Sequence, residues 1–81
     1  GQYDAAIQAY LDAERSGGGA WWVAWCDYGI ASIYGRRGDS VNAVQYLRRA
    51  IARDSACKIE ARTEPDFNPV RADPSFQALL R

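Results

Sequence analysis

The chain has 81 residues, 48% of them hydrophobic, and its ten basic and ten acidic side chains leave it without net charge. This length and composition predict a single globular domain. A neutral chain lacks the overall field that attracts nucleic acid or an anionic membrane, and no apolar run reaches the roughly 20 residues that span a bilayer. We therefore expect no nucleic-acid or membrane partner, and the polar N-terminus without a basic start favours a cytoplasmic protein.

Two helices are predicted in the first half of the chain. The first, Tyr3 to Glu14, carries apolar side chains at helical spacing and polar residues on the opposite side. Three consecutive glycines at 17–19 end it, because glycine loses much conformational entropy in a helix. The second helix is expected from Ala20 to Tyr34, with Gly35 as its left-handed C-terminal cap.

Two more helices are predicted after Gly38. Asp39 is a suitable N-cap for a helix from Ser40 to Arg53. Ser55 is a suitable N-cap for a short helix from Ala56 to Arg62.

The tail after residue 63 contains three prolines, which a long helix would not tolerate in its interior. Asn68 and Asp73 precede two of these prolines and are suitable N-caps. The tail should therefore form a single helical turn at 69–72 and a last helix at 74–80. Because no segment alternates with a two-residue period, no strand is expected, and the predicted fold is all-α.

The chain also resembles itself at a spacing of 37 residues, since the segment 1–13 aligns with the segment 38–50. The matching pairs are Gly1 and Gly38, Ala6 and Ala43, Ile7 and Val44, Gln8 and Gln45, Tyr10 and Leu47, and Ala13 and Ala50. Small residues that recur on amphipathic helices at such a period are typical of stacked helical repeats. Proteins of this kind form surfaces that bind other proteins.

These residues resemble the tetratricopeptide repeat, a helix–turn–helix unit of a superhelical α-solenoid. The positions that carry the resemblance are Ile30, Ala31, Tyr34, Gly38, Ala43, Leu47 and Ala50. The resemblance implies one domain over 1–81, with the second helix of a partial repeat at 1–16 and a complete repeat at 20–54. Because Gly1 falls in the middle of a repeat, we expect the chain to be part of a longer protein.

The last part of the chain, 55–81, is expected to cap the superhelix. The run from Arg62 to Leu80 resembles the closing segment of many bacterial tetratricopeptide proteins. An open repeat end exposes apolar surface and needs an atypical unit to cover it. The residues expected to provide that cover are Phe67, Val70, Phe76, Leu79 and Leu80.

The helix expected over 20–34 carries the candidate binding site. Trp21, Trp25, Tyr28 and Ser32 recur at the spacing of one helix face. The resemblance implies that this face lines a concave groove, whereas Cys26, Ile30, Ile33 and Tyr34 face the core. The competing interpretation is that the aromatic residues pack against a neighbouring or missing helix.

Catalysis, cofactors and metal ions are not expected. The chain has no histidine, and its two cysteines fit the small core positions of a helical repeat. Zinc would need about four nitrogen or sulfur ligands. Arg48, Arg49 and Arg53 are expected on the solvated outer face of their helix.

The sequence thus predicts a protein–protein interaction scaffold, the terminal part of a larger tetratricopeptide protein. Its partner would be a protein or peptide, but the lysines and asparagines with which some members grip a terminal carboxylate are not at the expected positions. The alternative is a homo-oligomerisation module of a bacterial signalling or regulatory protein, in which two copies exchange helices. A small-molecule pocket framed by Trp21, Trp22, Trp25 and Tyr28 is a third possibility.

Overall fold

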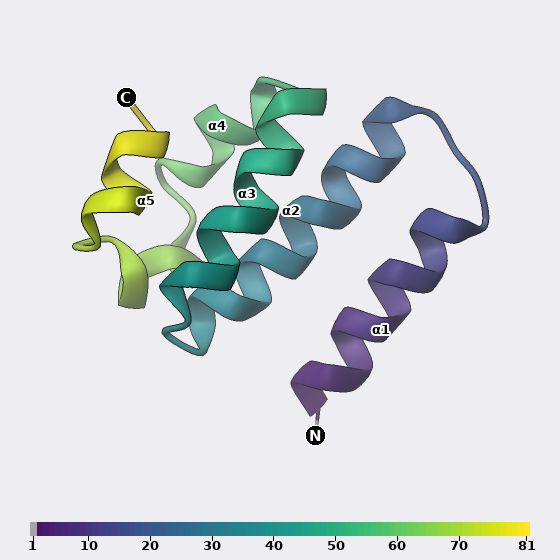
Figure 1. Cartoon of the computed structure of the whole chain (residues 1–81), viewed down its shortest axis with the longest axis horizontal. Coiled ribbons are helices and arrows are strands. Elements are labelled where there is room, and N and C mark those ends of the chain that lie inside the picture. Colours follow the sequence, from purple (N-terminus) through teal and green to yellow (C-terminus); the bar gives the residue numbers. More distant parts are fainter. Residues whose placement is uncertain (1) are drawn as a thin grey trace.

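The computed structural model describes residues 2–81, which form helical segments and no β-strand. In chain order they are α1 (Gln2–Arg15), α2 (Ala20–Arg36), α3 (Ser40–Arg53), α4 (Ala56–Ala61), the 3-10 helix η1 (Pro65–Val70) and α5 (Pro74–Leu79). Figure 1 shows α1, α2 and α3 side by side and antiparallel, with α2 in the middle, while α4, η1 and α5 lie on the side away from α1. The predicted all-α class is confirmed.

The caps of α3 and α5 follow from their sequences. The Asp39 side chain accepts a hydrogen bond from the Asn42 amide at 3.2 Å, at the start of α3. The Asp73 carboxylate accepts hydrogen bonds from the Ser75 and Phe76 amides at 2.9 and 3.2 Å, at the start of α5. Both predicted caps are confirmed, since a side-chain oxygen satisfies amides that have no partner within the helix.

The other two predicted caps make no capping hydrogen bond. Ser55 stands at the N-cap position of α4, as predicted, but its side chain makes no capping bond, and Asp54 Oδ1 accepts the Ala56 amide at 3.0 Å. Asn68 does not begin a turn either, since it lies inside η1, which starts earlier with Glu64 as its N-cap. In both cases an acidic residue further upstream, Asp54 or Glu64, accepts a backbone amide with its side chain.

The predicted left-handed cap at Gly35 is also wrong, because α2 continues to Arg36 and Gly38 has the positive φ, +77°. Gly35 instead lets the tail approach α2 closely. A Cβ atom at this position would lie 2.7 Å from Cδ1 of Phe67 and 2.9 Å from the Asp66 carbonyl oxygen. The missing side chain therefore makes room for the tail against the end of α2.

The larger part of the core lies between α2, α3 and the tail. Buried alanines on both long helices allow close packing around Leu47. From the tail, Phe67, Val70 and Phe76 are buried as expected, and Leu79 and Leu80 pack partly buried against them. Phe67 lies edge-on to Tyr28 with ring centroids 5.7 Å apart, and 5.3 Å from the ring of Phe76. The tail therefore covers the apolar end of the helix pair.

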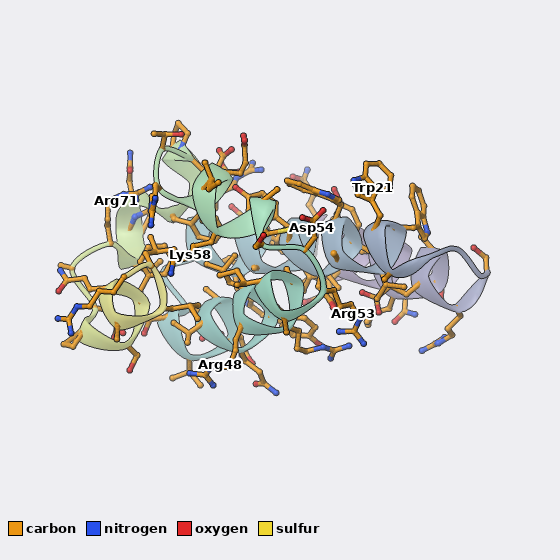
Figure 2. All side chains as sticks on the ribbon, turned by 90° about the horizontal axis from the view of Figure 1, so that it is seen from above. Trp21, Arg48, Arg53, Asp54, Lys58 and Arg71 are labelled. Carbon is orange, nitrogen blue, oxygen red and sulfur yellow. The ribbon has the colours of Figure 1, made fainter. Side chains whose placement is uncertain are left out.

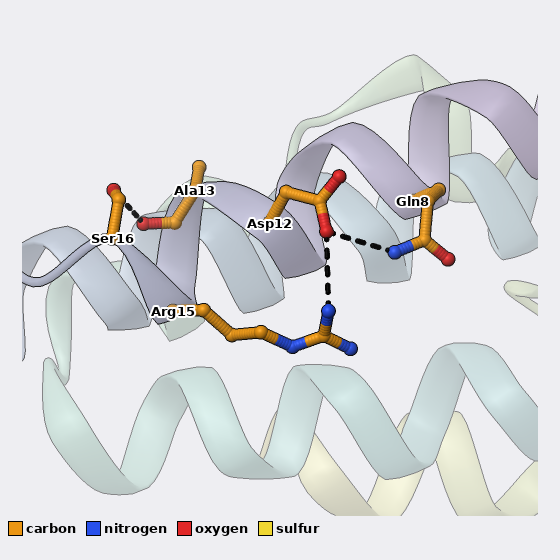
Figure 3. A network of polar contacts seen from close by, with 5 residues as sticks. All are labelled: Gln8, Asp12, Ala13, Arg15 and Ser16. Carbon is orange, nitrogen blue, oxygen red and sulfur yellow. Dashed lines mark hydrogen bonds and ion pairs between the residues drawn. The ribbon is translucent and has the colours of Figure 1, made fainter.

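Helix α1 packs on the opposite side of α2 through a smaller cluster, formed by Ile7, Ile30 and Ile33. Its outer surface is polar: Figure 3 shows Gln8 and Arg15 contacting Asp12 Oδ1 at 2.9 and 3.2 Å. The helix is thus amphipathic, with one apolar side on α2. No helix in residues 2–81 is long and apolar enough to cross a membrane.

Replacing Phe76 with Ala should lower the free energy of unfolding by about 3–5 kcal/mol, because the side chain is fully buried and its loss leaves a cavity. Urea denaturation followed by circular dichroism measures this change. The control Val41→Ala removes a side chain that is 76% exposed and should cost less than about 0.5 kcal/mol. A loss below about 1 kcal/mol for Phe76→Ala would show that the tail does not close the core.

Candidate functional site

The structure divides the predicted face of α2 into exposed and buried parts. Trp21 is 64% exposed, and Trp25 and Ser32 are half-buried. Ser32 Oγ donates a hydrogen bond to the Gly29 carbonyl oxygen at 2.8 Å. The expectation that Tyr28 belongs to an exposed stripe is wrong, since this residue is only 8% exposed. The tail brings Phe67 against it, a long-range contact that helical spacing alone could not predict.

The residues expected to face the core do so. Cys26, Ile30 and Ile33 are buried, and Tyr34 is partly buried against the same cluster. Helical spacing was enough to place them, because they share the side of α2 that meets α1 and α3.

Four aromatic side chains form one surface beside α1. Together with Cys26, they line a cavity of about 140 Å³: Tyr10, Trp21, Trp22 and Trp25. We call these four residues the aromatic surface. Tyr10 was not among the predicted site residues, and Trp22 was considered only for a small-molecule pocket. Tyr10 reaches the site because its ring lies over Gly29, where a Cβ atom would be 2.5 Å from its Cζ.

Two of the three indoles are held by hydrogen bonds. Trp22 Nε1 donates to the Ala13 carbonyl oxygen at 3.1 Å, and Trp25 Nε1 donates to Asp54 Oδ2 at 3.2 Å. The Trp25 ring also lies 5.2 Å from the ring of Tyr28. The aromatic surface is therefore preorganised, which lowers the entropy that a partner must overcome on binding.

A buried polar cluster joins the three long helices. Asp27 is fully buried, and its Oδ2 lies 3.5 Å from Arg49 Nε and 3.5 Å from Arg53 Nη1. The expectation that Arg48, Arg49 and Arg53 lie on an exposed face is confirmed, since all three residues are exposed. Arg49 and Arg53 in addition reach Asp27 with their guanidinium groups. A buried carboxylate needs such partners, since an unpaired charge in the interior is strongly destabilising.

Glu14 of α1 adds a second carboxyl group to this cluster. Burial and its hydrogen bond with Asp27 raise the pKa of Glu14 from 4.5 to about 7, although Arg49 and Arg53 oppose the shift. Glu14 Oε1 and Asp27 Oδ1 are buried, and neither atom has a hydrogen-bond donor within reach in the structure. Two ionised carboxylates can only accept hydrogen bonds, so this contact is favourable when a proton is present, and the raised pKa of Glu14 favours its protonated form below about pH 7. Sequence analysis missed both acids, although an aspartate in so apolar a helix was a visible signal.

The cysteines are not suited to nucleophilic chemistry. Burial raises the pKa of Cys26, and burial together with the Asp54 and Asp27 carboxylates raises the pKa of Cys57 to about 11. Both thiols are therefore protonated near neutral pH, and the thiolate is the reactive form. Within residues 2–81, no three potential ligands lie close enough to hold a metal ion.

No protein-family model matches the chain, and no curated protein or solved structure matches it either. A function must therefore be inferred from the described residues themselves. The aromatic surface and the buried polar cluster are the two features from which a function can be argued.

Replacing Glu14 with Gln should change how stability depends on pH. Between about pH 4.5 and 7, Glu14 keeps its proton in the folded protein and loses it in the unfolded chain. Its contribution to the free energy of unfolding is therefore complete below about pH 4.5 and is lost as the pH rises through about 7. Glutamine stays neutral and can donate to Asp27 at every pH. The variant should therefore gain stability relative to the wild type between about pH 5 and pH 8 in urea denaturation.

The control for this experiment is Asp12→Asn, which removes an exposed carboxylate from the same helix. It should leave the pH dependence of unfolding close to that of the wild type. Parallel pH profiles for Glu14→Gln and the wild type would contradict the shared proton.

Proposed function

We propose that the chain is a protein–protein interaction module whose aromatic surface binds a protein or peptide partner. The observation that carries this proposal is the cavity lined by Tyr10 and three tryptophans, with Trp21 mostly exposed. Tryptophan and tyrosine are enriched among the residues that dominate binding energy at interfaces. Contiguous exposed apolar residues of this kind mark interaction sites on soluble domains.

The arrangement of the helices supports a tetratricopeptide-like solenoid as the setting of this surface. Helices α2 and α3 are antiparallel and pack through buried small residues, among them Ala31, Ala43 and Ala50. The tail covers the apolar end of this pair, as the capping unit of a repeat array would. We therefore propose that the chain is the terminal part of a scaffold within a larger bacterial protein.

Self-association is the second candidate, and it is favoured by the uneven burial of the internal repeat. Ala43 and Ala50 are fully buried by α2, whereas their counterparts Ala6 and Ala13 on α1 are only partly buried. Ala6 packs at the edge of the cluster between α1 and α2, so only the part of this side that α2 leaves open could accept a further helix from a second copy. Such a contact would form a closed, two-fold symmetric dimer.

The proposed function predicts that peptides selected from a random displayed library will depend on Trp21. Trp21→Ala should weaken their binding at least about tenfold, as expected for a residue that dominates an interface. It should change the free energy of unfolding by less than about 0.5 kcal/mol, because the side chain is mostly exposed. Tryptophan fluorescence of the remaining indoles and urea denaturation measure the two effects.

The matched control is Val41→Ala, which removes an exposed apolar side chain that does not line the cavity. Its affinity for the selected peptides should equal that of the wild type. A selection without a common sequence, or peptides that bind Trp21→Ala normally, would contradict the proposed function.

The second candidate predicts a mass that rises with protein concentration in light scattering after gel filtration. Ala6→Arg should then restore the monomer mass, because a long charged side chain cannot enter a helix contact built on small residues. A monomer at every accessible concentration would exclude self-association as the main function.

A further inference from the structure

The segment that follows α3 carries an excess of carboxylates beside the aromatic surface. Its acidic residues are Asp54, Glu60, Glu64 and Asp66. Among residues 2–81, only Asp66 of this set forms an ion pair, with Arg36 at 3.6 Å. Asp54 directly contacts the aromatic surface through its hydrogen bond with Trp25. In the described part of the chain, Asp54 therefore places a carboxylate without an ion pair at the edge of the aromatic surface.

Of the basic side chains nearby, Arg71 donates to the carbonyl oxygens of Ala61, Arg62 and Glu64, and two others contact the C-terminus. Lys58 Nζ donates to the Arg81 carbonyl oxygen, and Arg62 donates to the Leu80 carbonyl oxygen at 3.3 Å. In Figure 2, Lys58 and Arg71 lie toward the C-terminal helix. Arg48 and Arg53 lie on the side opposite Trp21, and Asp54 lies between α4 and Trp21. Arg48 and Arg53 of α3 thus lie away from the aromatic surface.

Tyr28 connects the aromatic surface to these carboxylates. Its hydroxyl group is buried and has no hydrogen-bond partner in the structure. Burial raises the pKa of Tyr28, and the nearby carboxylates of Glu64 and Glu60 raise it further. The phenol therefore stays protonated. Because Glu64 and Glu60 act on Tyr28, whose ring lies 5.2 Å from that of Trp25, these carboxylates lie near one edge of the aromatic surface.

We propose that the partner places a basic side chain, arginine or lysine, on this face, an inference that rests on the proposed interaction function. A guanidinium or ammonium group over an indole ring is attracted by the negative face of the ring. The carboxylate of Asp54 at Trp25, and those of Glu60 and Glu64 near Tyr28, add attraction of the same sign. The apolar stem of the side chain would lie in the cavity lined by Tyr10 and Trp25. An acidic segment would be repelled by the same groups.

Three acetylated and amidated peptides that differ only in charge test this proposal. They consist of three repeats of Ala-Arg-Ala-Leu, Ala-Gln-Ala-Leu or Ala-Glu-Ala-Leu. The arginine peptide should bind about tenfold more tightly than the glutamine peptide, with little binding of the glutamate peptide. Tryptophan fluorescence and chemical-shift changes in the labelled protein measure the affinities and locate the contact.

Two sets of variants assign the effect to this face. The double variant Glu60→Gln, Glu64→Gln should weaken binding of the arginine peptide about three- to tenfold and leave the affinity for the glutamine peptide unchanged. Asp12→Asn, an exposed acid on α1, is the matched control and should change neither affinity. Trp21→Ala should weaken the binding of both peptides. In the wild type, the difference in affinity between the arginine and glutamine peptides should decrease with added salt.

The outcomes separate this inference from the proposed function. Equal binding of the three peptides, with a common loss in Trp21→Ala, overturns the charge preference and leaves the interaction function supported. If the arginine peptide binds Trp21→Ala and the double variant Glu60→Gln, Glu64→Gln as tightly as the wild type, the inference is overturned, because the contact then lies elsewhere. If none of the three peptides binds while the library peptides bind through Trp21, the charge preference is overturned and the interaction function is not. If the library peptides do not bind either, both proposals are overturned.

Discussion

The burial of α2 on three of its sides is the constraint on which the rest of this structure depends. Helix α1 covers one side, α3 a second, and η1 with α4 a third. Gly29 and Gly35 make two of these approaches possible, under Tyr10 and Phe67 respectively. One strip of the helix then has no covering element, and Trp21, Trp25 and Ser32 lie on it. The aromatic surface is therefore a direct result of how the helix is packed.

The same burial explains the unusual electrostatics of the interior. An aspartate at the centre of α2 is unfavourable unless each long helix supplies a partner, and here α1 provides Glu14 and α3 provides Arg49 and Arg53. Because the three helices must align for these groups to meet, the cluster restricts their relative register. Apolar packing through alanines and isoleucines is less demanding, since it tolerates small shifts along the helix axes.

Local sequence signals predicted most of the fold and about half of the site. The helical period and the capping residues Asp39 and Asp73 depend on near neighbours, so they could be read directly. Gly35 and Tyr28 were misjudged because their environment is set by Phe67, a residue more than thirty positions away. The contacts of Asp27 with distant arginines were missed for the same reason.

The glycine linker between α1 and α2 has a consequence for exchange between molecules. Gly17 and Gly18 both adopt positive φ, and the short connection keeps α1 close to its own binding side on α2. Short flexible linkers give effective concentrations in the millimolar range. A free α1 from another molecule reaches that level only in very concentrated solution. Molecules that meet at micromolar concentration therefore retain their own α1, and any lasting contact between them must use surfaces that the docked helix leaves open.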